Sequence, residues 1–172
     1  MLKQRAMILL AALCCLLLAG CGRESAETDA FLAVYSLSGE SDEVTLSNGV
    51  LVLTDTEQTL DGGNLYYHPA EPFDTVRYTT EIYLSAGGER TVLISMGAQD
   101  TTGGGLEVSS DVGGCSGQML TEEQVYGLKE ASCFFELTCT DRSGEEGIYT
   151  LPLTLTEVVA PEETAAEEIS QS

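Results

Sequence analysis

The amino-acid sequence predicts an all-β domain, folded as an antiparallel β-sandwich. Short apolar runs recur along the chain, and clusters of Gly, Asn, Asp and Ser separate them. Several runs alternate apolar and polar side chains at period two, as a sheet with one buried face requires. One segment carries a helix-starting signal, and no helical pattern stands between the strands. Strands without intervening helices pair antiparallel, so a sandwich follows.

The first half of the predicted domain contains four strands. A strand at 31–37 is followed by a hairpin, in which 43–46 and 50–54 pair across a turn at Ser47-Asn48-Gly49. Asn-Gly favours such a turn because both residues accept positive φ angles. Asp61-Gly62-Gly63 then predicts a turn into a strand at 64–68.

The strongest predicted hairpin joins 75–85 to 90–98 through Ala86-Gly87-Gly88-Glu89. Its first strand alternates regularly, and its second strand carries apolar residues at every other position. We therefore expect two sets of side chains to share the buried face: Val76, Tyr78, Ile82 and Leu84 from the first strand, with Val92, Ile94 and Met96 from the second.

The next segment, 97–118, carries seven glycines and is predicted as loop, with one short strand at 106–109. Thr121 and Gln124 have the spacing of a capping box, which predicts a short helix from there to about residue 130.

Two further strands complete the predicted domain, which spans 30–159. The strand at 132–140 places four residues on one face: Cys133, Phe135, Leu137 and Cys139. The strand at 148–158 contains Pro152, which indicates a sheet edge or a bulge because proline has no N–H to donate. An immunoglobulin-like sandwich is the natural expectation, although the chain has no tryptophan.

The N-terminus has the order of a secretory signal: Lys3 and Arg5 precede an apolar run of 14 residues at 6–19, which is shorter than the ~20 of a bilayer span. The run ends in Leu18-Ala19-Gly20-Cys21, which resembles the lipobox of bacterial lipoproteins. The resemblance covers only this N-terminal segment. It implies that residues 1–20 are a signal peptide and that Cys21 becomes the diacylglyceryl-modified N-terminus.

The resemblance also implies a location, on the extracytoplasmic face of the cell membrane, where the lipid anchor would hold the protein. Residues 21–29 would form the lipidated tether, and the acidic segment 160–172 is predicted to be a disordered tail. Lys3 and Arg5 would leave with the signal peptide, so five basic residues would remain against 28 acidic ones. Such a charge repels nucleic acid, which we exclude as a partner.

Three cysteines then remain for the domain: Cys115, Cys133 and Cys139. Cys133 and Cys139 fall on one predicted strand about 20 Å apart, which is too far for a disulfide. Cys115 lies in a Gly-rich loop, from which it can reach either of them. We predict a disulfide from Cys115 to Cys133, or alternatively to Cys139, with free thiols in the core as the other interpretation.

Catalytic and metal signatures are weak. His68 is the only histidine, and no Cys-x-x-Cys or His-x-x-x-His spacing accompanies it, so we predict no metal site and no cofactor. Asp55, Glu57, Asp61 and Asn64 offer oxygen ligands in loops, but without the spacing of a calcium loop. No Gly-x-Ser-x-Gly elbow is present.

These observations favour a protein that is not an enzyme: a lipid-anchored binding or interaction module of the bacterial envelope, whose partner is an unidentified envelope protein or glycan. An accessory subunit of an envelope complex is a related possibility. The alternative is an enzyme or metal-handling lipoprotein that uses Cys115, Cys133, Cys139, His68 and the acidic loops.

Overall fold

The computed structural model describes residues 31–159. The predicted signal peptide, the lipobox with Cys21, the tether and the acidic tail lie outside the described residues. The described part contains nine strands and one short helix: β1 (Leu32–Glu40), β2 (Val44–Thr54), β3 (Gln58–Asp61), β4 (Asn64–Tyr67), β5 (Thr75–Ala86), β6 (Glu89–Gln99), β7 (Gly114–Gly117), α2 (Glu122–Tyr126), β8 (Ser132–Asp141) and β9 (Glu146–Val159).

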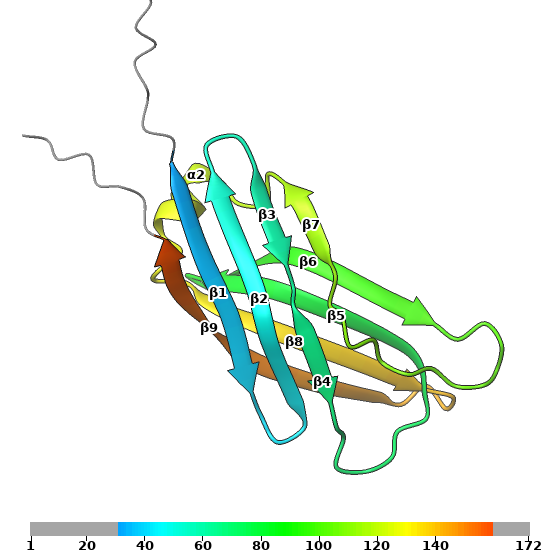
Figure 1. Ribbon diagram of the computed structural model, residues 1–172. Helices are drawn as coiled ribbons and strands as arrows, with labels where there is room; N and C mark the ends of the chain where they lie inside the picture. The colour runs from blue at the N-terminus through cyan, green and yellow to red at the C-terminus, as the bar shows by residue number, and fades with distance from the viewer. Residues whose placement is uncertain (1–30, 160–172) are drawn as a thin grey trace, which may run out of the picture. The chain divides into compact units, whose positions relative to one another are not determined.

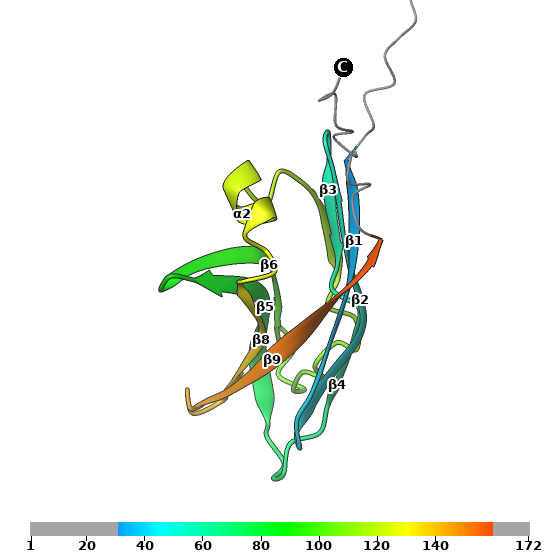
Figure 2. The ribbon, with the colours of Figure 1, turned by 90° about the vertical axis from the view of Figure 1, so that its left-hand side faces the viewer.

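The strands form one continuous sheet in the order β6-β5-β8-β9-β1-β2-β3-β7, with β4 paired to β2, and every pair is antiparallel. Figures 1 and 2 show the sheet curling so that β5, β6 and β8 face β1, β2 and β3. The all-β class is therefore confirmed. The sheet is nearly closed and barrel-like, so the finer prediction of two separate sandwich sheets is not confirmed.

Strand β9 makes this continuity possible because it crosses from one group of strands to the other, as Figure 2 shows. Its first part pairs with β8, and from Thr154 onward it pairs with β1. The prediction that Pro152 marks a sheet edge or a bulge is correct for the edge alone. The register of β9 with β8 runs through Pro152 without a shift, so there is no bulge, but Pro152 precedes the residues of β9 that pair with β1 and lies where β9 pairs on one side only. A Cβ at Gly39 of β1 would lie 2.6 Å from the Pro152 carbonyl oxygen, so the two backbones approach closely at the crossing.

The predicted hairpin around Asn48-Gly49 is wrong. β2 runs through both residues, and Asn48 takes a φ of 60° within the strand. Leu37 pairs with Gly49 while Gly39 pairs with Leu46, so β2 contributes one extra residue there. Asn48 is thus the left-handed residue of a β-bulge, which needs the same positive φ as a turn.

The hairpin of β5 and β6 is confirmed, but the predicted buried face of β6 is only partly correct. Ile82 pairs with Ile94 and Tyr83 with Val92, so Leu93 is the extra residue of another bulge. The bulge turns both Leu93 and Ile94 into the core and leaves Val92 44% exposed. Side chains along β8 follow the prediction, because all four of its expected core residues are buried: Cys133, Phe135, Leu137 and Cys139.

The region after β6 differs most from the prediction. Residues 106–109 form no strand, whereas Gly114–Gly117 pairs with β3 as β7. The capping box of α2 is present, since Thr121 Oγ1 accepts from the Gln124 N–H and Gln124 Oε1 accepts from the Thr121 N–H. The helix ends at Tyr126 and continues as turns through residue 130, so it is shorter than expected.

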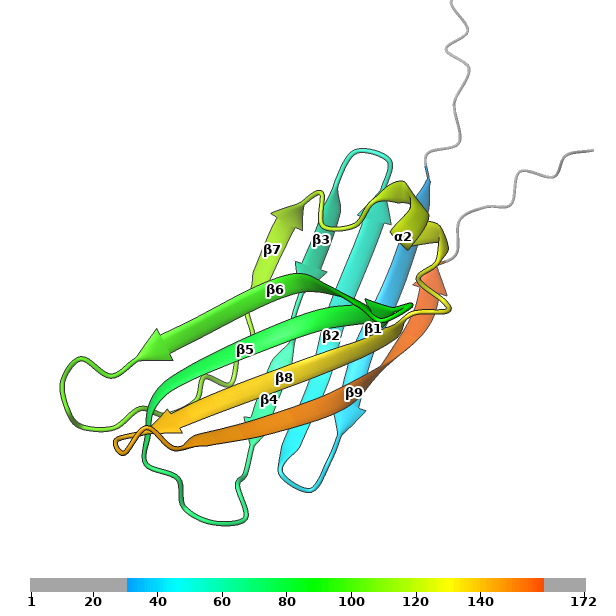
Figure 3. The same cartoon turned by 180° about the vertical axis from the view of Figure 1, so that it is seen from behind.

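The domain has two distinct ends (Figures 1 and 3). The end we call the loop end carries the β1–β2 turn, the β4–β5 loop, the β8–β9 turn and the start of the β6–β7 loop. The opposite end, which we call the helix end, carries α2 and the β5–β6 turn. Val34 pairs with Val159, so the described chain also begins and finishes at the helix end.

The edge strands β6 and β7 meet along a seam that closes the sheet through side chains. The Thr91 hydroxyl on β6 accepts a hydrogen bond from Gln124 Nε2 of α2 at 2.9 Å. The Cys115 thiol on β7 lies 3.5 Å from the Leu93 carbonyl oxygen on β6. β6 and β7 share no hydrogen-bonded ladder, because they are the two ends of the strand order.

Candidate functional site

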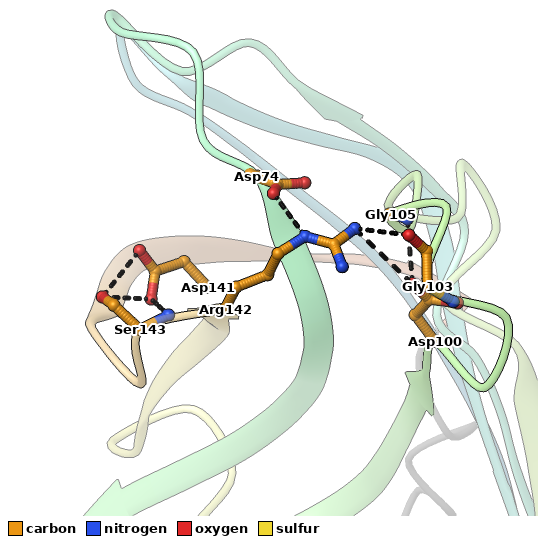
Figure 4. Close-up of polar contacts among 7 residues, drawn as sticks. All are labelled: Asp74, Asp100, Gly103, Gly105, Asp141, Arg142 and Ser143. Atoms are coloured by element: carbon orange, nitrogen blue, oxygen red, sulfur yellow. Dashed lines mark hydrogen bonds and ion pairs between the residues drawn. The ribbon is translucent and has the colours of Figure 1, made fainter.

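The loop end contains a polar cluster in which Arg142 joins three loops (Figure 4). Its Nε donates to Asp74 Oδ2 at 2.7 Å, and its Nη2 donates to the Gly103 carbonyl at 2.9 Å. Asp74 precedes β5, Gly103 follows β6, and Arg142 lies in the β8–β9 turn. The hydrogen bond to Asp74 raises the pKa of the Arg142 guanidinium. One side chain therefore fixes the relative positions of three connections.

Asp100 organises the loop that follows β6. Its Oδ1 accepts from the backbone N–H groups of Thr102 at 2.7 Å and Gly103 at 3.0 Å, and its Oδ2 accepts from Gly105 at 2.9 Å. These bonds favour the charged carboxylate and lower its pKa to about 2. The side chain is only 4% exposed, and Arg142 Nη2 lies 4.0 Å from Oδ2.

Asp141 has the same role in the β8–β9 turn. Its Oδ1 accepts from the backbone N–H groups of Ser143 and Glu145, each at 2.8 Å, and the Ser143 hydroxyl donates to both carboxylate oxygens. Hydrogen bonding, led by the Ser143 side chain, lowers the pKa of Asp141. A carboxylate held in this way favours its ionised form and is a poor proton donor near neutral pH.

The geometry of this cluster therefore fits a rigid, exposed loop surface better than it fits a catalytic site. The carboxylates of Asp100 and Asp141 accept hydrogen bonds from the backbone of their own loops, as Asp commonly does in turns. Sequence reasoning did not predict the cluster. The Asp-x-Thr-Gly and Asp-x-Ser-Gly spacings at Asp100 and Asp141 signal the local turns, but not that Arg142 connects them.

Three hollows lie at the helix end, beside α2 and the turn that follows it. The largest, 610 Å³, lies between the helix and the β5–β6 turn and includes Thr91 and Gln124. A second, 540 Å³, includes the ion pair of Lys129 with Glu157, whose Nζ and Oε2 are 2.9 Å apart. A third, 410 Å³, includes Tyr126, which is 74% exposed.

The three domain cysteines are unpaired in the structure, and each has its own surroundings. Cys133 and Cys139 are buried on β8, where burial raises the pKa of both thiols, that of Cys133 to about 12. Cys115 is half-buried on β7, and its thiol lies 3.4 Å from Met119 Sδ. The disulfide from Cys115 to Cys133 or Cys139 stays a prediction.

His68 does not join the cysteines, although its neighbour Tyr67 lies beside the Cys139 thiol. His68 is exposed just after β4 and stacks on Tyr66, with ring centroids 6.1 Å apart. Tyr66 is 66% exposed, whereas Tyr67 turns inward and donates to the Tyr149 hydroxyl at 3.0 Å. Burial raises the pKa of Tyr67. The exposed pair offers a small aromatic surface rather than an acid–base pair.

The acidic loop residues considered as calcium ligands make local backbone contacts. Asp55 Oδ2 accepts from the Phe31 N–H at 3.0 Å, and Asp61 Oδ1 accepts from the Gly63 N–H at 2.9 Å. Glu57 lies exposed immediately before β3, and Asn64 is the exposed first residue of β4. Within residues 31–159, no three His, Cys, Asp or Glu side chains gather as a metal-binding group.

A second cluster that the sequence analysis missed covers the outer face of β5, β6 and β8. The Arg90 guanidinium lies 3.6 Å from the centre of the Tyr83 ring and forms ion pairs with Glu81 and Glu136. Tyr83 stacks in turn on Phe134, with centroids 5.3 Å apart. This stacking explains why Tyr83 is 9% exposed although it faces outward.

The part of the chain described by the structure contains no helix with the length and apolarity of a membrane span. Comparison with protein-family models, with curated proteins and with solved structures gave no match for this chain.

Proposed function

We propose that this chain is a lipid-anchored, non-catalytic binding module on the extracytoplasmic face of a bacterial membrane, and that its loop end contacts an envelope protein or glycan. The observation that carries the proposal is the sequence Leu18-Ala19-Gly20-Cys21 after a charged and then apolar N-terminus. A diacylglyceryl group on Cys21 supplies two acyl chains, enough for durable membrane attachment.

The geometry of the domain supports this orientation. β1 enters the domain at the helix end, so a tether of residues 21–29 would attach there. Nine extended residues reach at most about 30 Å, which keeps the helix end near the bilayer. The loop end, held rigid by Arg142 and Asp100, would then face away from the membrane.

The sandwich architecture predicted from the sequence belongs to this proposal as well. Side chains from both groups of strands contribute to one apolar core, including Leu51 from β2 and Ile82 from β5. We propose that the two groups act as two packed layers, with an immunoglobulin-like connection as one form, and that β9 bridges them.

Lipid attachment can be tested by metabolic labelling with radioactive palmitate. The unmodified chain should be labelled and recovered with membranes, whereas Cys21→Ala should lose both the label and the attachment. Cys15→Ala is the matched control, because it changes a cysteine within the apolar run. An unlabelled wild-type chain, or a Cys21→Ala chain that stays membrane-bound, would refute the anchor.

The binding role can be tested by placing a photo-crosslinking residue at one end or the other of the domain. Thr101 is exposed at the loop end, and Glu57 is exposed in the β2–β3 turn at the helix end. We expect a discrete crosslinked partner from position 101 in intact cells and none from position 57. Capture from neither position would contradict the binding role, and capture from position 57 alone would contradict the orientation.

A further inference from the structure

The largest hollow at the helix end is bordered by three separate parts of the chain (Figures 2 and 3). α2 forms one wall, the β5–β6 turn forms the second, and the turn between α2 and β8 forms the third. Gln124 Nε2 donates to Thr91 Oγ1 at 2.9 Å and so joins the first wall to the second. In the third wall, the N–H groups of Glu130 and Ala131 both donate to the Gly127 carbonyl. Fixed contacts therefore shape the hollow, and its 610 Å³ lies within the range of small-ligand sites, about 300–1,000 Å³.

The β5–β6 hairpin gives the hollow an apolar floor and one acidic side chain. Leu84 pairs with Thr91, and Ala86 pairs with Glu89. Paired residues and residues two apart share a face, so these four side chains lie on the inner face of the hairpin. Leu84 is 4% exposed and Ala86 is exposed, which places apolar surface beneath the opening. Arg90 alternates to the outer face, where its ion pairs lie, and so does not neutralise Glu89.

Two more carboxylates border the hollow, and they too lack a positive partner. Glu123 comes from α2 and Glu130 from the turn after it, and both are exposed, as is Glu89. None of the three has a basic partner within residues 31–159, because all four basic side chains there form ion pairs with other acids: Arg77, Arg90, Lys129 and Arg142. The hollow therefore combines an apolar floor with three unpaired negative charges, one from each wall.

This combination is complementary to a ligand in which several positive charges are joined by methylene groups. A small inorganic cation would answer the charges but leave the apolar floor in water, whereas an aliphatic chain removes that floor from water. We propose that the hollow binds a linear aliphatic polyamine. Its ammonium groups meet the carboxylates of Glu89, Glu123 and Glu130, and its methylene groups cover the floor. This site goes beyond the binding module proposed above and depends neither on the lipid anchor nor on the loop end.

The proposal is tested by isothermal titration calorimetry of the full chain, purified in detergent, with spermidine as the probe. We expect one spermidine per chain, with an affinity that falls as sodium chloride is added because salt screens exposed charges. Hexaamminecobalt(III) is the control ligand, since it carries the same charge without methylene groups, and it should bind at least about tenfold more weakly. Absence of spermidine binding would overturn the proposal. Equal binding of the two cations would also overturn it, because it would reflect general attraction to an acidic protein.

Single variants show whether the hollow is the site. Glu123→Gln and Glu130→Gln should each weaken spermidine binding by about two- to fivefold, the scale of one exposed ion pair. Glu122→Gln is the matched control, because Glu122 precedes Glu123 in α2 but borders the other hollow, beside Tyr126, and should leave the affinity unchanged. Ala86→Trp covers the floor with a neutral ring at an exposed position and should weaken binding about tenfold, with folding verified by unfolding curves. Equal weakening by Glu122→Gln and Glu123→Gln, or unchanged affinity in Ala86→Trp, would overturn the proposal.

Discussion

The middle of the sheet and its seam hold together in different ways. In the middle, β5, β8, β9, β1 and β2 share long hydrogen-bonded ladders and bury large side chains such as Phe135 and Leu37, which are 0% and 1% exposed. At the seam, β6 and β7 touch through Cys115, and polar side chains such as Gln58 and Asp100 fix the neighbouring segments. In this nearly closed sheet, hydrogen-bonded ladders hold the middle strands firmly together, whereas side-chain contacts alone join the two edge strands.

The largest effect is expected from Phe135→Ala, because the Phe135 ring is fully buried in the middle of the sheet. Removing it should lower the free energy of unfolding by about 3–5 kcal/mol, from lost burial and the cavity left behind. Urea unfolding of the purified protein measures this. Val92→Ala on β6 is the matched control, since Val92 is 44% exposed and should change stability by about 0.5 kcal/mol or less. Equal losses of unfolding free energy in the two variants would show that the middle and the seam do not differ in how they stabilise the fold.

A smaller effect is expected from Gly39→Ala at the crossing of β1 and β9. The added Cβ would lie 2.6 Å from the Pro152 carbonyl oxygen, which is backbone and must move. Overpacking of this kind costs about 1–3 kcal/mol, measurable by the same urea unfolding. Gly104→Ala, where the nearest atom to an added Cβ is 3.6 Å away, should be tolerated. A stable Gly39→Ala variant would mean that the crossing is looser than described.

Gln58→Leu tests the seam side of the comparison. Gln58 Oε1 accepts from the N–H groups of Met119 and Leu120, and Nε2 donates to the Leu120 carbonyl, with distances of 2.7–2.9 Å. Leaving these buried groups without partners should cost about 1–3 kcal/mol. Hydrogen exchange should accelerate at Met119 and Leu120 but not along β8. The exposed neighbour substitution Gln118→Leu should have no such effect, and unchanged exchange in Gln58→Leu would contradict this role.

The smallest effect, and the only pH-dependent one, is expected at Asp100. Its pKa is lowered to about 2 in the folded protein from 3.8, so the charged form stabilises the fold at neutral pH. This contribution should be lost as the pH falls from about 4 toward 2. Asp100→Asn should therefore be less stable than wild type at pH 7, with the difference shrinking over that window. Thermal unfolding measures it, with Asp42→Asn as an exposed control. A pH-independent difference would contradict the carboxylate's role.

The sequence predicted best those strands whose burial follows a simple alternation. β8 is the clearest case, because Cys133, Phe135, Leu137 and Cys139 repeat at period two and all face the core. The bulges at Asn48 and Leu93 could not be predicted, because positive φ at Asn48 suits either a turn or a bulge. The choice depends on pairing with β1, a distant strand.

The polar cluster and the contact of Cys115 across the seam were beyond sequence reasoning for a related reason. Arg142 meets Asp74 and Gly103 only because the start of β5 and the ends of β6 and β8 lie side by side. β7 has no apolar pattern of its own and exists through its pairing with β3. Cys115 consequently meets the Leu93 carbonyl across a seam that no local pattern indicates.

The side-by-side entry of β1 and exit of β9 also determines how the domain would respond to mechanical force. Antiparallel ladder bonds run perpendicular to the strands, so tension that separates Phe31 from Val159 acts directly along those bonds. They would break one after another from the Val34–Val159 pair inward, as in a zipper, rather than all together as in shear. A chain held at one end and pulled at the other would release its last strand first and at low force.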